Sequence, residues 1–230
     1  MSRTLVPVVV ALAACSDPPP EASFTEDRRI DAADPGNDPD SIGTRMCTTD
    51  DGHVYVAWLD DRARDDGGVD LWMNRSADLG ASWLPAPVQV NHGDGSVWNP
   101  ALHCDDDGVY VVWEDDRDGE LQMHQVYYNQ STDGGETFLP DDRRLDDDPD
   151  GGSMSIGPQI TGDGRALFVV WSDGANGAYD VMLTRGSPDG DWTEPVRMDS
   201  DPRGSAHSGQ ARVAVGGGGV WVVWEDTRNG

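Results

Sequence analysis

A short apolar strand that ends in tryptophan recurs four times along this chain at nearly constant spacing. The copies read VYVAW, VYVVW, LFVVW and VWVVW, and they end at Trp58, Trp113, Trp171 and Trp224. The separations between successive tryptophans are 55, 58 and 53 residues. A period of this length is typical of proteins built from one repeated supersecondary unit, so it limits the possible folds more than composition does.

Each repeat predicts four short β-strands. A second apolar segment precedes each tryptophan strand, as PALHC precedes VYVVW, and Asp-Gly or Gly-rich turns between the two indicate a hairpin. A third segment such as QVYYNQ and a fourth such as RRLD follow. The tryptophan strand is apolar on both faces, which is expected of a sheet covered on each side by another sheet. We therefore predict an all-β fold, a β-propeller of four-stranded antiparallel blades with about 55 residues per blade.

The predicted propeller occupies residues 24–230. Three full repeats are followed by part of a fourth, which stops at WEDTRNG. The stretch SFTEDRRID at 23–31 resembles TFLPDDRRLDD at 137–147, the outer strand of a later repeat. We expect three blades plus a partial fourth in a C-terminally truncated sequence, with the N-terminal strand able to complete the last blade.

The first residues have the order of an export signal. Arg3 precedes an apolar stretch at 5–14, which is too short to cross a bilayer as a helix. Leu-Ala-Ala-Cys at 12–15 resembles the bacterial lipobox, which implies lipidation of Cys15; an ordinary secretory signal with an incidental cysteine is the alternative. We predict a signal peptide at 1–14, a lipidated cysteine and linker at 15–23, and a location at the bacterial outer membrane or cell surface.

The charge of the chain excludes several partners. Sixteen Lys and Arg residues stand against 43 Asp and Glu residues, for a net charge of −27. A phosphate backbone would be repelled over most of such a surface, so we expect no nucleic-acid partner and no membrane contact except through the lipid.

Two cysteines and one acidic loop are candidate structural sites. Cys47 and Cys104 occupy matching places in two successive repeats, so they can face each other between sheets as a disulfide; two buried free thiols are the alternative. Asp146, Asp148 and Asp150 form an Asp-x-Asp-x-Asp-Gly arrangement that can surround calcium, although a solvated acidic loop is the alternative. No cofactor is required by the sequence, and calcium is the one candidate.

A polar turn closed by an aromatic residue also recurs, after the third strand of each repeat. It reads SADLGASW, STDGGETF and, in a shortened form, SPDGDW. The shared residues are Ser76, Asp78, Gly80 and Trp83; Ser131, Asp133, Gly135 and Phe138; and Ser187, Asp189 and Trp192. This pattern resembles the Asp-box, or BNR repeat, of sialidase-like β-propellers. Ser and Asp side chains can bond the backbone of such a turn, so we predict a structural role for it.

The resemblance implies a test for catalysis, because sialidases of this fold grip a carboxylate with three arginines, the first in an Arg-Ile-Pro motif on an inner strand. The matching positions read IGT, WNP, IGP and SGQ, from Ile42, Trp98, Ile156 and Ser208, and contain no arginine. Arg45 and Arg212 fall nearby at equivalent sites. If they point into the central channel they can hold a carboxylate; pairing with local acids is the alternative.

Carboxylates for glycoside hydrolysis can be drawn from Asp60, Asp70 or Glu114. A Trp-x-Asp-x-Arg pattern supplies the pairs Asp60/Arg62, Asp115/Arg117 and Asp226/Arg228. Its repetition favours a structural role, because an active site is needed once.

The sequence thus favours an exported, lipid-anchored propeller that acts as a non-enzymatic binding or scaffolding module for a glycan or a protein. The alternative is a sialidase-type glycoside hydrolase whose catalytic residues lie partly outside this sequence. A purely structural envelope protein is a third class.

Overall fold

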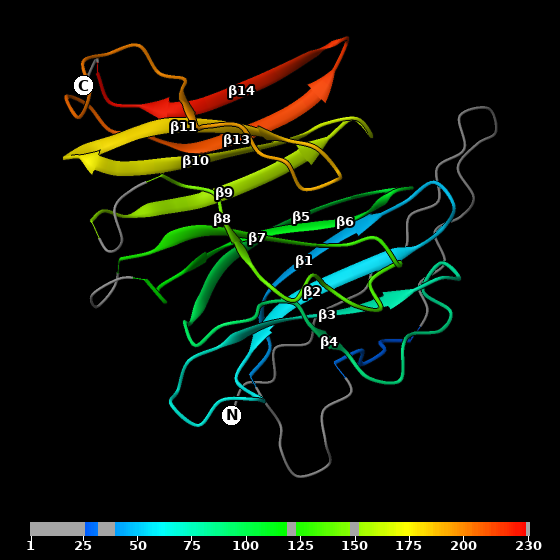
Figure 1. Ribbon diagram of the computed structural model, residues 1–230. Helices are drawn as coiled ribbons and strands as arrows, with labels where there is room; N and C mark the ends of the chain where they lie inside the picture. Colours follow the sequence, from blue (N-terminus) through cyan, green and yellow to red (C-terminus); the bar gives the residue numbers. More distant parts are fainter. Residues whose placement is uncertain (1–25, 32–39, 119–122, 148–151, 229–230) are drawn as a thin grey trace.

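The computed structural model describes residues 26–31, 40–118, 123–147 and 152–228. Within these ranges the protein is built from β-strands joined by turns and loops (Figure 1). The described part of the chain contains no helix that is long and apolar enough to span a bilayer. The predicted signal peptide and the whole of the predicted linker, including Cys15, lie outside the described residues, as do Asp148 and Asp150.

The strands form four antiparallel sheets in chain order. The first sheet contains β1 (Ile42–Thr48), β2 (Val54–Asp60), β3 (Asp70–Ser76) and β4 (Val88–Gln89). The second contains β5 (Val97–Asp105), β6 (Gly108–Asp115), β7 (Gln125–Ser131) and β8 (Arg143–Arg144). The third contains β9 (Ser155–Gly162), β10 (Leu167–Asn176), β11 (Ala178–Gly186) and β12 (Val196–Arg197). The fourth contains β13 (Ser208–Gly216) and β14 (Gly219–Asp226). This confirms the predicted all-β architecture of four-stranded antiparallel blades.

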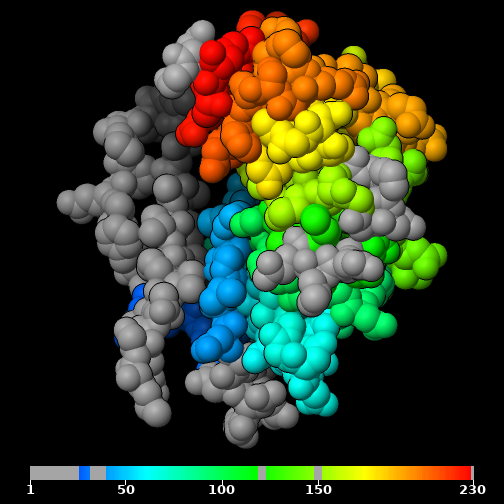
Figure 2. Space-filling view, turned by 90° about the vertical axis from the view of Figure 1, so that its left-hand side faces the viewer, coloured from blue at the N-terminus to red at the C-terminus, as the bar shows by residue number. Residues whose placement is uncertain are grey.

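The sheets stack face to face in sequence order, visible in Figure 2 as a run of colours from cyan through green and yellow to red. We call the face of a sheet that is turned toward the next sheet in the chain its forward face, and the opposite face its rear face. Tyr55 and Ala57 of β2 lie on a forward face, in one cluster with Val111 and Trp113 on the rear face of β6. Trp113 and Trp171 are fully buried. The tryptophan strands β6 and β10 are apolar on both sides because both sides meet another sheet.

The N-terminal segment 26–31 packs on the rear face of the first sheet. Ile30 contacts the cluster of Val54, Val56 and Trp58, and its carbonyl accepts a hydrogen bond from Asn74 Nδ2 at 2.8 Å. Asn129 of the second sheet donates in the same way to the carbonyl of Val90, at 3.3 Å. Since Val90 directly follows the outer strand β4, segment 26–31 occupies the place of an outer strand from a preceding sheet.

A disulfide joins Cys47 of β1 to Cys104 of β5, with a Cα–Cα distance of 6.0 Å. The prediction that the two cysteines occupy matching places is wrong by one residue. Cys47 pairs with Tyr55, whereas the residue paired with the equivalent Tyr110 is His103. Because side chains alternate along a strand, that offset turns one cysteine forward and the other rearward, so they meet. The bond spans 57 residues, for which the chain-entropy model gives about 4 kcal/mol of stabilisation.

The first two Asp-box turns are closed by their own side chains. The Ser76 hydroxyl donates to Asp78 at 2.7 Å and accepts from the Gly80 backbone N–H at 2.8 Å. Ser131 makes the same two bonds, to Asp133 and from Gly135, at the same distances. Gly80 and Gly135 have φ of 87° and 80°, the left-handed region that glycine adopts without strain.

The aromatic residues of all three turns pack against hydrophobic clusters of the sheets. Trp83 joins the cluster of Val54, Val56 and Trp58, while Phe138 and Trp192 pack against the clusters on either side of the second sheet. The third turn is closed differently, by hydrogen bonds between Ser187 and the backbone of Asp191. Asp189 lies in this turn without taking the position that Asp78 and Asp133 take in theirs.

Candidate functional site

The propeller has two unlike sides. The Asp-box turns and the β1–β2, β5–β6 and β9–β10 hairpins lie at one end of the strands. We call the opposite end the entry side; it carries the turns that leave β2, β6 and β10 and the connections that lead into β5, β9 and β13. The inner strands of the four sheets begin there.

Every inner strand has an irregularity at the same point near the entry side. At this point the register between the inner strand and its neighbour shifts, in β1, β5, β9 and β13 alike. The backbone is left-handed at four equivalent residues, with φ of 66°, 46°, 65° and 55° for Gly43, Asn99, Gly157 and Gln210. An asparagine or glutamine in this conformation costs on the order of 1 kcal/mol, so the fold imposes the bulge. Bulges of this kind turn side chains and backbone groups to new directions.

One buried carboxylate beside these bulges is not common to all four sheets. Glu114 follows Trp113 directly, and the equivalent residues after the other tryptophans are Leu59, Ser172 and Glu225. Glu114 is 2% exposed and lies on the forward face of the second sheet, against the start of β9. Because two other sheets fold with Leu and Ser at this position, the fold of a single sheet does not require a buried carboxylate there.

Three donors hold the carboxyl group of Glu114. Asn99 Nδ2 and the backbone N–H of Gly157 donate to Oε1, at 2.8 and 2.7 Å. His124 Nδ1 lies 2.8 Å from Oε2. Both left-handed residues around this group, Asn99 and Gly157, thus direct a donor at it. The bulges of two neighbouring sheets and one histidine of the entry side together fix the plane of the carboxyl group.

An aromatic ring lies beside this carboxylate. Trp98 stacks on the His124 ring with centroids 4.3 Å apart and an interplanar angle of 11°. Trp98 is half-buried and Asn99 is exposed, so both reach the surface above Glu114. An indole face, an amide and a carboxylate together offer apolar contact and hydrogen bonding to one ligand.

Sequence reasoning found only part of this cluster. Glu114 was a candidate carboxylate, but Trp98, Asn99 and His124 were not assigned to a site. Their only signal was indirect: Trp98 and Asn99 stand in the WNP copy of the inner-strand motif, where two other copies have Ile-Gly. The fourth copy was expected to begin at Ser208, but the register places Gly209 and Gln210 at these positions, one residue later. The contact between His124 and Glu114 joins the turn before β7 to β6 and required the structure.

Arg45 and Arg212 lie at equivalent places on the first and last inner strands. Each is exposed, and each bonds backbone carbonyls of its own bulge: Arg45 those of Gly43 and Thr44, and Arg212 those of Gln210 and Ala211. Because β1 and β13 belong to different sheets, with two others between them in the stack, the structure does not bring the two arginines into one contact. Carboxylate binding by them stays a prediction.

The Trp-x-Asp-x-Arg carboxylates form structural ion pairs. Asp60 accepts from Trp58 Nε1 at 2.7 Å and pairs with Arg62 at 2.5 Å. Asp115 is bound in the same way by Trp113 and Arg117. Asp60 is therefore occupied by contacts that recur from sheet to sheet, and we do not assign it to a site.

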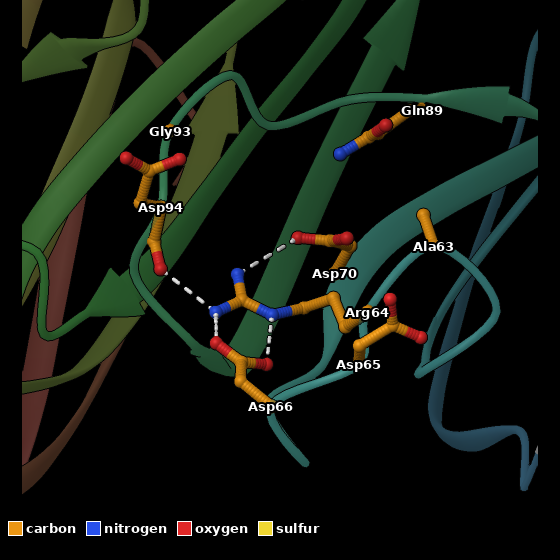
Figure 3. Close-up of a pocket in the computed structure, with 8 residues that line it drawn as sticks. All are labelled: Ala63, Arg64, Asp65, Asp66, Asp70, Gln89, Gly93 and Asp94. Atoms are coloured by element: carbon orange, nitrogen blue, oxygen red, sulfur yellow. Dashed lines mark hydrogen bonds and ion pairs between the residues drawn. The ribbon is translucent and has the colours of Figure 1, made fainter.

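A hollow of about 540 Å³ also lies on the entry side but toward the outer strands of the first sheet (Figure 3). It is lined by Ala63, Arg64, Asp65, Asp66, Asp70, Gln89, Gly93 and Asp94. The hydrogen bond to Asp66 raises the pKa of the Arg64 guanidinium and lowers the pKa of that carboxyl. Arg64 also lies 3.5 Å from Asp70 and donates to the carbonyls of Asp94 and Gly95.

A substitution in the repeat explains this hollow. The outer strands of the second and third sheets place Arg144 and Arg197 beside the acids that follow them, Asp146 and Asp199. The first sheet has Gln89 at that position, and Arg64 reaches in from the turn after β2 instead. The hollow is thus the space left where an arginine of the outer strand is missing, and its Arg64 is already paired with Asp66 and Asp70.

The predicted calcium loop can be placed only in part. Asp146 is 8% exposed, accepts a hydrogen bond from the backbone N–H of Val126 and pairs with Arg144 at 2.6 Å. Among the described residues there is no group of three His, Cys, Asp or Glu side chains that could hold a metal ion. Calcium binding stays a prediction.

No protein-family profile matches the chain. No curated protein matches it in sequence either. Solved structures do share its fold. An α-L-arabinanase of Penicillium chrysogenum, complexed with arabinobiose, is 14% identical over 81% of this chain and 57% of its own, with a TM-score of 0.59.

Two further structures give the same result. A family GH93 α-L-arabinofuranosidase of Fusarium graminearum, also with arabinobiose, is 14% identical over 75% of this chain and 52% of its own, with a TM-score of 0.56. A family 117 glycoside hydrolase of Zobellia galactanivorans is 11% identical over 88% of this chain and 71% of its own, with a TM-score of 0.50. The chain therefore spans little more than half the length of the first two, and it has the fold of β-propeller glycoside hydrolases.

This comparison corrects the favoured function. The hypothesis of a non-enzymatic binding or scaffolding module is contradicted, because the three solved structures named above are glycoside hydrolases. The sialidase-type alternative receives no specific support from them.

Proposed function

We propose that this chain belongs to a β-propeller glycoside hydrolase and that its glycan site lies on the entry side, around Glu114. The observation that carries the proposal is the buried Glu114 carboxylate, which has no counterpart in the first and third sheets and is fixed by Asn99, Gly157 and His124. The fold shared with glycoside hydrolases at 11–14% identity supports it.

The residues of the site have separable roles in this proposal. Trp98 offers an aromatic face to a sugar ring, and the amide of Asn99 bonds a sugar hydroxyl. Glycoside hydrolysis uses a pair of carboxyl groups, and Glu114 is the one we assign. Its three donors place the group before substrate arrives, so little ordering is left for the moment of binding.

The proposed substrate is an uncharged glycan of the arabinan type. Two of the similar structures hold arabinobiose, and a chain with a net charge of −27 repels anionic sugars. The more specific resemblance to sialidases rests on the Asp-box turns. The hydrogen bonds of these turns join residues of the same turn to one another. We further propose, from the sequence, that the protein is exported and tethered through Cys15.

The test is hydrolysis of arabino-oligosaccharides and of a 4-nitrophenyl arabinofuranoside, with a sialoside in the same panel. We expect Glu114→Gln to lower kcat/KM at least 100-fold, because an amide cannot transfer a proton or act as a nucleophile. Glu225→Gln is the matched control, since Glu225 holds the same place in the fourth sheet.

Thermal unfolding shows whether each variant is folded. Equal activity of the Glu114→Gln and wild-type proteins would remove Glu114 from the site. A wild-type protein that neither cleaves nor binds any member of the panel would contradict the proposal as a whole. Cleavage of the sialoside alone would restore the sialidase alternative.

A further inference from the structure

A second group of rings lies on the entry side, where the third sheet meets the fourth. Tyr179 is the second residue of β11, and His207 directly precedes β13. Their ring centroids are 5.7 Å apart, and the Tyr179 backbone N–H donates to His207 Nδ1 at 3.5 Å. Tyr179 is only half-buried although β13 packs on its sheet, so part of this residue reaches the surface.

Met154, which directly precedes β9, joins Tyr179 to the site around Glu114. The Tyr179 hydroxyl donates to Met154 Sδ at 3.8 Å. The residue after Met154 donates its backbone N–H to the carbonyl of His124 at 2.8 Å, and the His124 ring stacks on Trp98. We call Trp98, His124, Met154 and Tyr179 the entry-side strip. None of its four residues is Asp, Glu, Lys or Arg, although these make up 26% of the chain.

The fold does not require a ring at Tyr179 or a thioether at Met154. Tyr179 is equivalent to Val69 of the first sheet and to His124 of the second, because each precedes the partner of the aspartate that stands two residues after the tryptophan. Met154 is equivalent to Ser96 by the same reasoning on the inner strands. The large side chains are therefore found where the strip continues from Trp98, and not at the junction of the first two sheets.

We propose that Tyr179 and Met154 form a second sugar-binding site for the same glycan chain, so that the substrate is a linear, uncharged glycan that lies along the entry-side strip from Trp98 to Tyr179. A phenol ring and a thioether offer apolar contact to a sugar ring, and the phenol oxygen can accept a hydrogen bond from a sugar hydroxyl. This second site rests on the proposed function, because it extends the site around Glu114. Two contacts on one chain raise the affinity for long sugars above that for short ones.

Binding of two sugars of different length tests this proposal. Arabinobiose and arabinooctaose are titrated calorimetrically into the Glu114→Gln protein, so that cleavage does not shorten the longer sugar. We expect arabinooctaose to bind at least about tenfold more tightly, which corresponds to about 1.4 kcal/mol of binding free energy. Tyr179→Val, added to this protein, should remove that difference, because it places at Tyr179 the residue that the first sheet has there.

Two controls separate the ring of Tyr179 from other effects. Tyr179→Phe keeps the ring and should keep most of the difference between the two sugars. Leu79→Ala removes an apolar side chain in the first Asp-box turn, at the opposite end of the strands, where Leu79 is 55% exposed. This variant should keep the whole difference. Near-ultraviolet circular dichroism checks that each variant is folded.

Equal affinity for the two sugars before Tyr179 is changed overturns the second site, and so does a difference that survives Tyr179→Val. A loss of the same size in Leu79→Ala also overturns it, since any exposed apolar side chain would then serve. The hydrolysis panel on the wild-type protein reports on the proposed function separately. If the wild-type protein cleaves arabino-oligosaccharides but the Glu114→Gln protein binds both sugars equally, only the second site is lost. A protein that neither cleaves nor binds these sugars contradicts both.

Discussion

At the scale of the residue, the same ion pair has different surroundings in the second and fourth sheets. Arg117 donates to Asp115 at 2.9 Å and lies 2.8 Å from Asp142; the side chains of both acids are 0% exposed. Arg228 pairs with Asp226 in the fourth sheet, where the two side chains are 34% and 17% exposed. Water can replace the arginine in the second case much more readily than in the first.

We predict from this difference that Arg117→Ala lowers the free energy of unfolding by about 3–5 kcal/mol, because it leaves two buried carboxylates without their cation. Arg228→Ala is the matched control and should lose clearly less. Equilibrium unfolding in urea, with the disulfide intact, measures both. Equal losses for the two variants would mean that burial does not set the strength of this pair.

At the scale of the element, the Asp-box turn is stabilised by an ionised carboxylate. Burial acts to raise the pKa of Asp133, but hydrogen bonds from Thr137 and Ser131 and from backbone N–H groups outweigh it and lower the pKa to about 2. Since the folded pKa lies below the ordinary value of 3.8, the stability that this group adds is present above about pH 4. It is lost as the pH falls toward 2.

The expected result is a difference in melting temperature between wild-type and Asp133→Asn proteins that is constant above pH 4 and shrinks between pH 4 and pH 2. A thermal unfolding series across this range measures it. Asp189→Asn is the comparison, because Ser187 and the backbone of Asp191 close the third turn. A wild-type advantage that stays unchanged down to pH 2 would show that the neutral acid closes the turn equally well.

At the scale of the whole molecule, charge opposes folding. A net charge of −27 is held on a chain whose apparent isoelectric point is about 4.1. Arginines in the repeated ion pairs neutralise some acids locally, but the sum remains strongly negative at neutral pH. Compaction brings these charges closer together, and salt screens their repulsion.

We therefore expect the melting temperature at pH 7 to rise by roughly a few degrees when sodium chloride is raised from about 0.02 to 0.5 M. Near pH 4 the same addition should have little effect, because the net charge is then close to zero. Differential scanning calorimetry at both pH values gives the comparison. A rise of the same size at both would assign the effect to something other than charge repulsion.

The architecture was predictable because it depends on local patterns that repeat. Strand order, the hairpins and the Asp-box turns follow from short stretches, and Trp58, Trp113 and Trp171 are buried as their two-sided apolar strands indicate. The site was only half predictable. Glu114 could be noticed as a candidate carboxylate, but its donors could not. Asn99 of β5 and His124 of the turn before β7 reach it within the second sheet, and the Gly157 N–H of β9 reaches it only because the second sheet packs on the third.

The sequence by itself determined the repeat, its four short strands, the turn chemistry and the excess of negative charge, since each depends on residues close together in the chain. The tertiary structure decided which side chains and backbone groups of separate strands and sheets meet. It set the one-residue offset that lets Cys47 meet Cys104 and the three donors around Glu114. The physical reason is the alternation of side chains along a strand: a shift of one residue reverses the face on which a side chain lies, and only the register of the folded sheet fixes that shift.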